Sequence, residues 1–308
     1  MAAASETMTV EVEGRRLKVS NLDKVLYPAT ETTKGEVLHY YAQVASTLLP
    51  HLADRPVTRI RWPNGVEGQS FFEKNLPSGA PGWLPAVTID APGSRSGNDE
   101  VTYPLVGDVA TLTYLANLAS LELHVPQWRI GGGDEGGEGH ELLPPDRLVI
   151  DLDPGPPAGL HECARVALLV RDRLAELGMT CAPVTSGSKG MQLYATLDGS
   201  RDSDTVRDLA KEIAQELTKA EPDLVLWKMT RSMRPGKVLL DWSQNVAAKT
   251  TISPYSLRGR TAPFVAAPRT WEEIEHGAEH EDALRQLQMS EVLERIDSEG
   301  DLFTLQLG

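Results

Sequence analysis

An apolar run that ends in two acids, RLVIDLDPGPP at residues 147–157, narrows the possible folds of this 308-residue chain more than any other stretch. Its three consecutive apolar residues predict a buried strand. Because side chains two residues apart on a strand point to the same side, we expect Asp151 and Asp153 to project together while Leu152 turns into the core. The two carboxylates would then repel each other unless positive charge lies between them.

Divalent cations are the positive partners that best suit such a pair of carboxylates. Two ions about 3.5–4 Å apart, held by carboxylate oxygens, are the arrangement used for in-line phosphoryl transfer, and a third carboxylate usually completes it. The stretch KVLLDWS at 237–243 offers Asp241, which also ends an apolar strand run. The alternative is that DLDPG is only a strand-to-turn transition, where aspartate is common, so the pattern alone leaves both interpretations open.

A short turn of small residues lies between these acids in the sequence. In TSGSKGMQLY, residues 185–194, the turn from Ser186 to Gly190 could offer backbone N–H groups and the Lys189 cation to a phosphate. Any hairpin could use the same residues as its turn. Their position between the acid pair and Asp241, beside a basic cluster, favours the phosphate-binding interpretation.

Charge is unevenly distributed along the chain. The net charge of −14 argues against a nucleic-acid binder, for which a basic surface is typical. Residues 271–300, however, carry ten acids against two arginines, which predicts a solvated C-terminal segment, whereas residues 228–260 carry seven basic residues against one acid. A second basic neighbourhood runs from Arg15 to Arg61. Because local patches determine where phosphates are attracted, the composition allows nucleic acid and nucleotide as ligands.

The composition also indicates a cytoplasmic protein without membrane segments. No run of about 18 apolar residues is present, and the N-terminal MAAASETMTV has neither the basic start nor the apolar middle of a signal peptide. Cys163 and Cys181 match no metal or disulfide spacing and suit a reducing compartment, so we expect both in the core.

Hydrophobic periodicity predicts a mixed chain whose second half alternates element types more clearly than the first. In the first half we expect a hairpin at 10–20, a helix capped by Thr33 and Glu36, strands at 56–65 and 124–130, a helix over 108–123 and a glycine-rich loop at 131–145. In the second half we expect a strand that ends with residues 149–151, a strand at 237–243 and two strands around the turn within 181–197. We also expect helices over 160–177 and 202–217 and an irregular segment at 250–260. This order predicts an N-terminal lobe of mixed structure to about residue 145, then a β-sheet lobe with helices on one face.

Three stretches, LVIDLDPG, TSGSKGMQLY and VLLDWSQN, closely resemble the three motifs of the polymerase domain of bacterial ligase D, a member of the archaeo-eukaryotic primase superfamily. The resemblance spans nearly all of residues 17–308, through NLDKVLYPATETTK, TRIRWPNG, FFEK, LELHVPQW, KTTISPYSLRGR and VAAPRTW. It implies an α+β primase-polymerase fold, in which an RRM-like β-sheet catalytic lobe with flanking helices packs on an N-terminal mixed α/β lobe. We expect a single domain over 1–308, with the N-terminal lobe at about 1–145, the catalytic lobe at about 146–270 and an acidic helical segment at 271–308.

The resemblance implies a nucleotidyltransferase: a template-directed DNA polymerase and primase that fills gaps and extends ends, with a preference for ribonucleotides, in DNA break or gap repair such as non-homologous end joining. Its expected ligands are NTP or dNTP and DNA with gaps or ends that bear a 5′-phosphate. A separate ligase and Ku are candidate partners, in a bacterial cytoplasm and near the nucleoid. Two other interpretations stay open: a DxD glycosyltransferase that binds a nucleotide-sugar through Mn²⁺, which leaves Asp241 unused, and a DNA-end-binding module without activity.

Carried over residue by residue, the resemblance assigns Asp151, Asp153 and Asp241 as catalytic ligands of two Mn²⁺ or Mg²⁺ ions. One ion would lower the pKa of the primer 3′-hydroxyl, and the other would neutralise the triphosphate. The cradle of the incoming nucleotide would comprise His124, Ser186, Lys189, Gly190, Gln192, Gln244, Arg258 and Arg260. From the residues alone, His124 could equally be a core histidine and the two arginines a solvated face, although arginine suits bidentate phosphate contacts.

The resemblance also assigns contacts with DNA. Asn21, Lys24 and Lys34 match the pocket for the 5′-phosphate, and Lys34 falls in the first turn of the predicted helix, where free N–H groups and the helix dipole favour an anion. The alternative is an ordinary surface lysine. Phe71 and Phe72, flanked by polar residues, would stack on template bases, an interaction worth about 1–3 kcal/mol per base, although one ring could belong to the core.

Two positions depart from the family pattern. The second family motif reads Ser-Gly-x-x-Gly-x-His, and its histidine position is Gln192 here, which can donate a hydrogen bond to a phosphate but cannot carry charge. We therefore expect altered nucleotide affinity or choice. In TRIRW, Ile60 stands where relatives place a basic residue, so a phosphate contact is expected to be missing or to come from Arg59 or Arg61.

Overall fold

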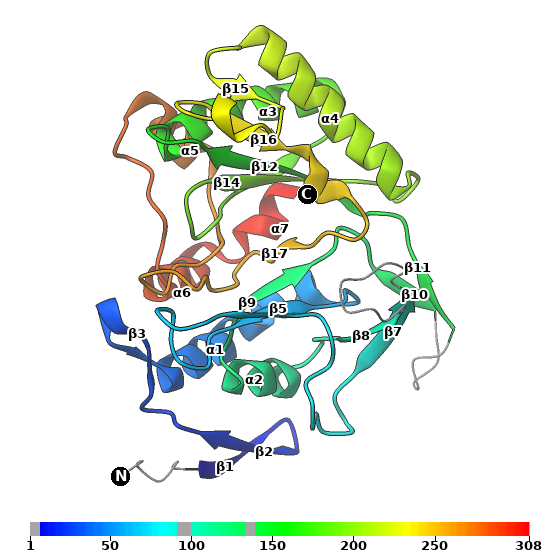
Figure 1. Cartoon of the computed structure of the whole chain (residues 1–308), viewed down its shortest axis with the longest axis vertical. Helices are drawn as coiled ribbons and strands as arrows, with labels where there is room; N and C mark the ends of the chain where they lie inside the picture. The colour runs from blue at the N-terminus through cyan, green and yellow to red at the C-terminus, as the bar shows by residue number, and fades with distance from the viewer. Residues whose placement is uncertain (1–6, 91–99, 133–138, 308) are drawn as a thin grey trace.

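A six-stranded sheet carries the acidic stretch that the sequence singles out (Figure 1). The computed structural model describes residues 7–90, 100–132 and 139–307. The strand order is β15-β16-β12-β14-β13-β18, antiparallel except for the parallel pair of β15 and β16. The strands are β12 (Arg147–Pro154), β13 (Cys181–Thr185), β14 (Met191–Thr196), β15 (Val225–Leu226), β16 (Val238–Asp241) and β18 (Ala267–Pro268).

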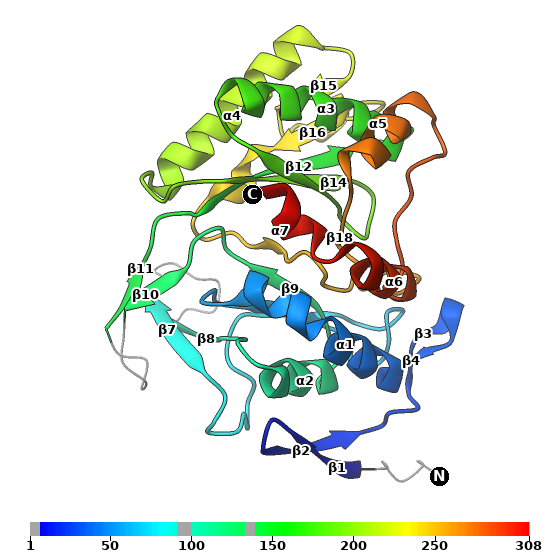
Figure 2. The same cartoon turned by 180° about the vertical axis from the view of Figure 1, so that it is seen from behind.

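Two long helices, α3 (Leu160–Glu176) and α4 (Ser203–Ala220), cover one face of this sheet (Figures 1 and 2). Alternate residues of β12 determine which face is covered. Leu148, Ile150 and Leu152 are buried in one apolar cluster with residues of α3 and α4, whereas Val149 belongs to a second cluster on the other face. The prediction of Leu152 in the core is confirmed. The prediction of helices on one face is incomplete, because Phe303 of α7 (Leu302–Leu307) packs against Tyr194 on the face opposite α3 and α4. Asp151 and Asp153 therefore share the face that the two helices leave open.

A four-stranded antiparallel sheet of order β17-β9-β5-β6 forms the second layer, and α1 (Lys34–Leu52) and α2 (Val109–Asn117) pack against it. Its strands are β5 (Thr58–Arg61), β6 (Phe71–Glu73), β9 (Ser120–Val125) and β17 (Thr251–Ile252). The predicted capping box of α1 is confirmed: the Thr33 side chain accepts from the Glu36 N–H, and the Glu36 carboxylate accepts from the Thr33 N–H. The apolar face of this helix is fully buried: Val37, Tyr40, Tyr41, Val44 and Leu48.

In the ranges that the structure describes, four hairpins and three C-terminal helices accompany these two layers. The hairpins pair β1 (Thr7–Val12) with β2 (Arg15–Ser20), β3 (Val25–Tyr27) with β4 (Thr32–Thr33), β7 (Ala86–Asp90) with β8 (Glu100–Pro104), and β10 (Ile130–Gly132) with β11 (His140–Leu142). The helices are α5 (Trp271–Glu279), α6 (Met289–Glu299) and α7 (Leu302–Leu307). They are not simply solvated as predicted, because Ile274, Val292 and Phe303 are buried in the two apolar clusters. No helix in the described ranges combines the length and the apolar character that crossing a membrane would require.

Two predicted elements have the wrong boundaries. The helix predicted over 108–123 ends at Asn117, and β9 begins at Ser120 after a left-handed turn at Ala119, because the residues that follow alternate with the period of a strand. The strand predicted at 124–130 is interrupted because Pro126 has no N–H to donate to a ladder. Within the predicted loop at 131–145, the flanks form β10 and β11, and residues 133–138 lie outside the described part of the chain.

Candidate active site

The three predicted catalytic aspartates come together on the open face of the six-stranded sheet. Asp241 on β16 lies directly opposite Asp151 on β12 in the antiparallel register, and Asp153 is two residues further along β12. Burial and the charges of Asp241 and Asp153 together raise the pKa of Asp151 to about 7, against a lowering by a hydrogen bond from Gln192. The charge of Arg258 lowers this pKa less than the other causes shift it, so a cation beside Asp151 would favour the charged carboxylate.

Neighbouring side chains hold the other two carboxylates. Arg234 Nη1 lies 2.8 Å from Asp153 Oδ2, while Asp241 accepts hydrogen bonds from the Ser243 N–H at 3.0 Å and from Gln244 Nε2 at 2.8 Å. All three acids offer only carboxylate oxygens, which are the ligands that Mg²⁺ and Mn²⁺ prefer. The excess negative charge and the donor set both fit divalent cations at this position.

A cavity of about 380 Å³ opens beside these acids. It is lined by most of the residues predicted for the metal ions and the nucleotide: His124, Asp151, Asp153, Ser186, Lys189, Gly190, Gln192, Gln244, Arg258 and Arg260. Ser188, Thr250 and Thr251 also line it, although the sequence did not single them out as nucleotide contacts. Asp241 does not line the cavity itself, but it accepts a hydrogen bond from Gln244, which is one of the lining residues. The predicted set thus comes from both sheets, since His124 belongs to β9 and Gln192 to β14.

The Ser186–Gly190 turn between β13 and β14 packs closely against β12. The Ser186 N–H donates to the Gly190 carbonyl at 3.0 Å, and Gly187 has a left-handed φ of +67°. A Cβ added to Gly190 would lie 1.9 Å from the Leu152 carbonyl oxygen, so any other residue would displace the turn. Glycine at this position therefore lets the turn approach the strand that carries the acids.

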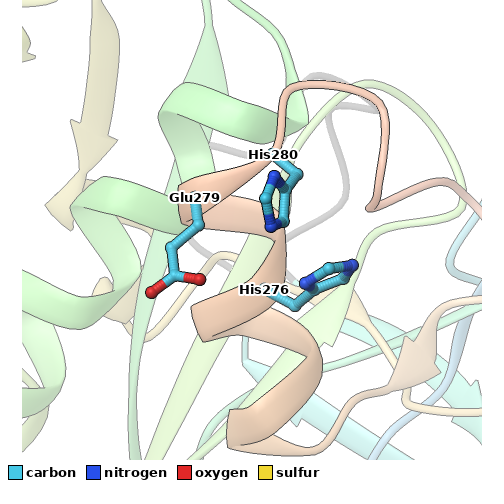
Figure 3. A group of neighbouring side chains, drawn as sticks. All are labelled: His276, Glu279 and His280. Atoms are coloured by element: carbon cyan, nitrogen blue, oxygen red, sulfur yellow. The ribbon is translucent and has the colours of Figure 1, made fainter.

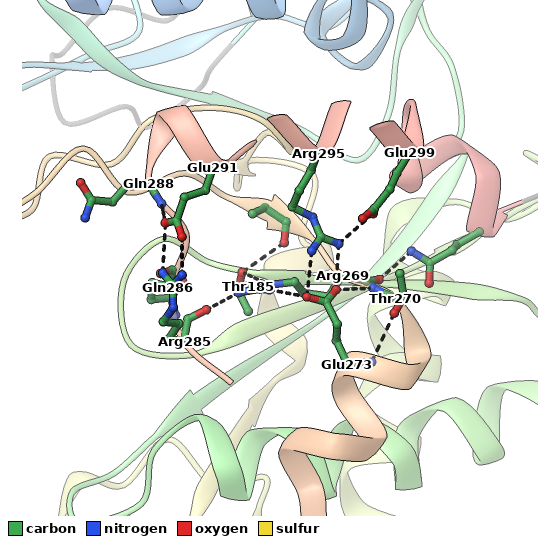
Figure 4. A network of polar contacts seen from close by, with 12 residues as sticks. Thr185, Arg269, Thr270, Glu273, Arg285, Gln286, Gln288, Glu291, Arg295 and Glu299 are labelled. Carbon is green, nitrogen blue, oxygen red and sulfur yellow. Dashed lines mark hydrogen bonds and ion pairs between the residues drawn. The ribbon is translucent and has the colours of Figure 1, made fainter. Parts of the chain in front are cut away.

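Gln286, which the sequence analysis missed, bridges both ends of this turn. Its Oε1 accepts from the Gly187 N–H at 2.7 Å, and its Nε2 donates to the Gly190 carbonyl at 3.1 Å. Ion pairs join parts of the C-terminal segment to one another (Figure 4): Arg269 and Arg295 both contact Glu273, and Arg285 contacts Glu291. Arg269 Nε also donates to the Thr185 hydroxyl of β13 at 3.3 Å, which connects the segment to the sheet. No local sequence signal distinguishes this glutamine, because its partners lie almost a hundred residues earlier in the chain.

Glu122 is a second residue that the sequence analysis missed. Its carboxylate, 4% exposed, lies 2.8 Å from His124 Nε2 and 3.2 Å from Arg258 Nη1, and it accepts from the Gly259 N–H at 3.0 Å. Burial raises the pKa of Glu122, but the His124 hydrogen bond and the Arg258 charge outweigh this effect, so the pKa lies below its ordinary value. Glu122 thus orients two cavity residues. Its spacing of two from His124 on a strand is the signal that could have revealed it.

Gln192 occupies the position of the family histidine and lies beside Asp151 in the sheet register. Its Oε1 accepts from the Tyr194 hydroxyl at 2.8 Å, and its hydrogen bond to Asp151 lowers the pKa of that carboxyl. The amide is therefore engaged with the acidic cluster and with Tyr194, although it also lines the cavity.

The residues predicted for a 5′-phosphate lie at the N-terminus of α1, apart from the cavity. Burial and the charge of Lys24 lower the pKa of Lys34 to about 8, so the two ammonium groups lie close enough to repel. Lys34 Nζ donates to the Ser20 carbonyl at 2.6 Å, and Lys24 Nζ donates to the Asn64 Oδ1 at 3.0 Å. Asn21 has a left-handed φ of 54°, and its carbonyl accepts from the Lys24 N–H at 3.1 Å.

The expectation of free N–H groups at this helix start is wrong. The N–H groups of Lys34 and Gly35 donate to the carbonyls of Lys24 and Leu22, and that of Glu36 donates to the Thr33 side chain. An anion here would interact with the two ammonium groups and the helix dipole rather than with free N–H groups.

Phe71 and Phe72 lie on the edge strand β6, and both rings are exposed, at 42% and 61%. Neither belongs to the core. Arg59 and Arg61, on the adjacent strand β5, both pair with Glu73, at 2.6 and 2.7 Å. Arg59 is almost completely buried, so Arg61 is the more accessible of the two for a phosphate.

Comparison with known proteins identifies relatives over almost the whole chain. The family model "LigD, primase-polymerase domain" matches residues 33–303. The multifunctional non-homologous end joining DNA repair protein LigD of Mycobacterium tuberculosis is 51% identical over 288 residues, which cover 94% of this chain and 36% of that protein. LigD of Mycolicibacterium smegmatis is 50% identical over 287 residues, 93% of this chain and 35% of that protein. The chain therefore spans about a third of the length of these curated relatives.

A solved structure agrees with these matches. The polymerase domain from Mycobacterium tuberculosis ligase D in complex with DNA superposes with a TM-score of 0.87 at 50% sequence identity, and the match covers 94% of this chain and 98% of that chain. The family resemblance, the primase-polymerase fold and the class of enzyme, a nucleotidyltransferase, are confirmed. The chain belongs to the family of LigD primase-polymerase domains.

Proposed function

We propose that this protein adds nucleotides, preferably ribonucleotides, to a primer 3′ end under the direction of a template, at gaps and broken ends that bear a 5′-phosphate. The role would be DNA break repair by non-homologous end joining, in partnership with a ligase and Ku. The observation that supports this most is the convergence of Asp151, Asp153 and Asp241 beside a cavity that also contains the Ser186–Gly190 turn.

The three aspartates would hold two Mg²⁺ or Mn²⁺ ions, which when bound would acidify the primer 3′-hydroxyl and neutralise charge on the triphosphate. The chain itself would position the reactants. Lys189, Arg258 and Arg260 line the cavity and could balance the triphosphate charge, with arginine suited to bidentate contacts. Glu122 would keep His124 and Arg258 in place through its two contacts, and the Gln286 bridge would fix the shape of the turn.

The DNA contacts would lie on the N-terminal side of the cavity. The close, mutually repelling ammonium groups of Lys24 and Lys34 would be stabilised by a phosphate dianion, and the exposed rings of Phe71 and Phe72 would offer stacking surfaces to template bases. Because adjacent strand residues point to opposite faces, the two rings would contact different bases or different surfaces. We propose that residues 1–308 act as one unit, since His124 comes from the four-stranded sheet and the aspartates come from the six-stranded sheet.

Primer extension on a gapped duplex with Mn²⁺ tests this function. We expect extension to be stronger with a 5′-phosphate than without it and stronger with NTP than with dNTP. Asp153→Ala should abolish extension but leave DNA binding largely intact, whereas Asp223→Ala, at an exposed position that does not line the cavity, should behave as wild type. Tight binding to the gapped duplex without any extension would instead indicate an end-binding module.

A further inference from the structure

Three potential metal ligands meet at the C-terminal end of α5, on an element that contributes nothing to the cavity described above (Figure 3). The ligand atoms of His276, Glu279 and His280 all lie within 4.8 Å of one another. The His280 N–H donates to the His276 carbonyl at 3.0 Å, so one helical turn separates the two histidines, and their ring centroids are 4.5 Å apart.

This spacing is close to what one metal ion requires. Ligand atoms at 2.0–2.2 Å from a tetrahedral ion are about 3.3–3.6 Å from one another, so modest side-chain rotations would bring these three to an ion. All three residues are exposed and can rotate. Within the ranges that the structure describes, no hydrogen bond or ion pair engages the imidazole nitrogens of His276 and His280 or the carboxylate of Glu279. The three donor groups are therefore available.

The surrounding charge favours a cation. Residues 271–284 contain six acids and no lysine or arginine. Glu273 is neutralised by Arg269 and Arg295, and Glu275 by Arg171, whereas Glu279 is unpaired within the described chain. The last turn of a helix also carries the negative end of its dipole, which stabilises positive charge.

We propose that His276, Glu279 and His280 form a second metal site, which binds one divalent ion of the class of Zn²⁺, Ni²⁺ or Cu²⁺ and leaves a fourth position open to water. Imidazole nitrogen suits these metals, whereas Mg²⁺ and Mn²⁺ favour the all-oxygen set of the aspartates. The two sites thus differ in the metal that each selects. This inference does not depend on the polymerase function, since none of its ligands lies in the cavity.

Occupation of the site would stabilise the end of α5. This helix packs on α3, where His161 Nδ1 lies 2.9 Å from the Gly277 carbonyl, and the chain after His280 returns to place Leu284 against Gly277. A metal ion that joins His276 and His280 would fix the last turn of α5, from which the chain leads back to Leu284. Metal binding to the folded form alone raises its thermal stability.

Zinc titration of the full chain without an affinity tag tests the proposal, with excess Mg²⁺ present to occupy oxygen sites. We expect one Zn²⁺ per chain by calorimetry, shifts of the His276 and His280 imidazole resonances by NMR, and an increase in Tm. The double variant His276→Asn/His280→Asn should bind Zn²⁺ more than about tenfold more weakly, since even the loss of an outer-shell partner costs 10–100-fold. His39→Asn, at an exposed histidine of α1, should bind as wild type.

Undiminished binding in the double variant would overturn the proposal. So would binding that disappears only in Asp151→Asn/Asp153→Asn, because the zinc would then occupy the aspartate site. Glu279→Gln should weaken binding to an intermediate degree, and an unchanged affinity in this variant would overturn the assignment of three ligands.

Discussion

The two faces of the six-stranded sheet use the same strand for opposite purposes. On the face covered by α3 and α4, Leu148, Ile150 and Leu152 are buried in an apolar cluster. On the open face, Asp151 and Asp153 alternate with them and approach Asp241. One face contributes stability by burying apolar area, and the other accumulates like charges, which reduces stability unless cations bind. Adjacent residues of one strand should therefore respond in opposite ways to substitution.

Asp151→Asn gives the largest expected effect and separates activity from stability. We expect primer extension to fall by about 100- to 1000-fold, as for other losses of preorganised electrostatic groups in an active site. The pKa of Asp151 is raised to about 7, so its ionisation costs stability as the pH rises from the ordinary carboxyl range through 7. In metal-free buffer at pH 8, chemical denaturation should show a free energy of unfolding at least as high as that of wild type. A clear loss of stability would break the comparison.

Ile150→Ala should show the opposite behaviour on the covered face. Removal of this fully buried side chain should lower the free energy of unfolding by about 2–5 kcal/mol. Primer extension per folded molecule should change by less than about threefold, because the side chain points away from the acids. A large loss of activity in folded protein would show that the two faces are not independent.

Gln286→Ala sharpens the comparison on the open face. Loss of two hydrogen bonds, at about 0.5–1.5 kcal/mol each, should loosen the Ser186–Gly190 turn and raise the nucleotide KM about tenfold, with a smaller change in kcat. Steady-state extension kinetics would measure both constants. Gln43→Ala, an exposed glutamine of α1, is the matched control. Equal losses in kcat and in the free energy of unfolding would indicate a merely structural role.

Lys24 and Lys34 form a basic pair that can be compared with the acidic cluster. Their effect on the preference for a 5′-phosphate is the smallest that we expect. The pKa of Lys34 is lowered from 10.5 to about 8, so the unfolded chain binds this proton more tightly, and stability should rise as the pH increases between 8 and 10.5. A bound phosphate needs the charged lysine. The preference for 5′-phosphorylated gaps should therefore weaken severalfold as the pH rises through 8, in binding assays by fluorescence anisotropy. Lys34→Met should lose the preference at every pH, and an unchanged preference would contradict the role of this lysine.

The sequence predicted best where a pattern repeats within a few residues. The alternation in β12 predicted that Leu152 is buried, and the Thr33 and Glu36 pair predicted the start of α1. Both predictions depend on the local geometry of a strand or a helix. Local periodicity failed where two periods overlap, as at Leu118, which fits the helical spacing of α2 although the helix ends one residue before it.

The arrangement of the cavity could not be predicted from local patterns. The register that places Asp241 opposite Asp151, and the return of the C-terminal segment that brings Gln286 to the Ser186–Gly190 turn, depend on tertiary contacts between distant segments. The family resemblance did predict that Asp241 joins Asp151, because it assigns both residues to the same metal site. It did not supply Glu122 or Gln286, which hold cavity residues in position.

Anomalous diffraction from crystals of the protein grown with Mn²⁺, nucleotide and gapped DNA tests the central claim most directly. Three carboxylates from two strands are proposed to hold the metal ions of nucleotidyl transfer. The account predicts manganese peaks within about 2.0–2.4 Å of oxygens of Asp151, Asp153 and Asp241. Manganese bound elsewhere, with Arg234 still paired to Asp153 and no peak among the three acids, would contradict it.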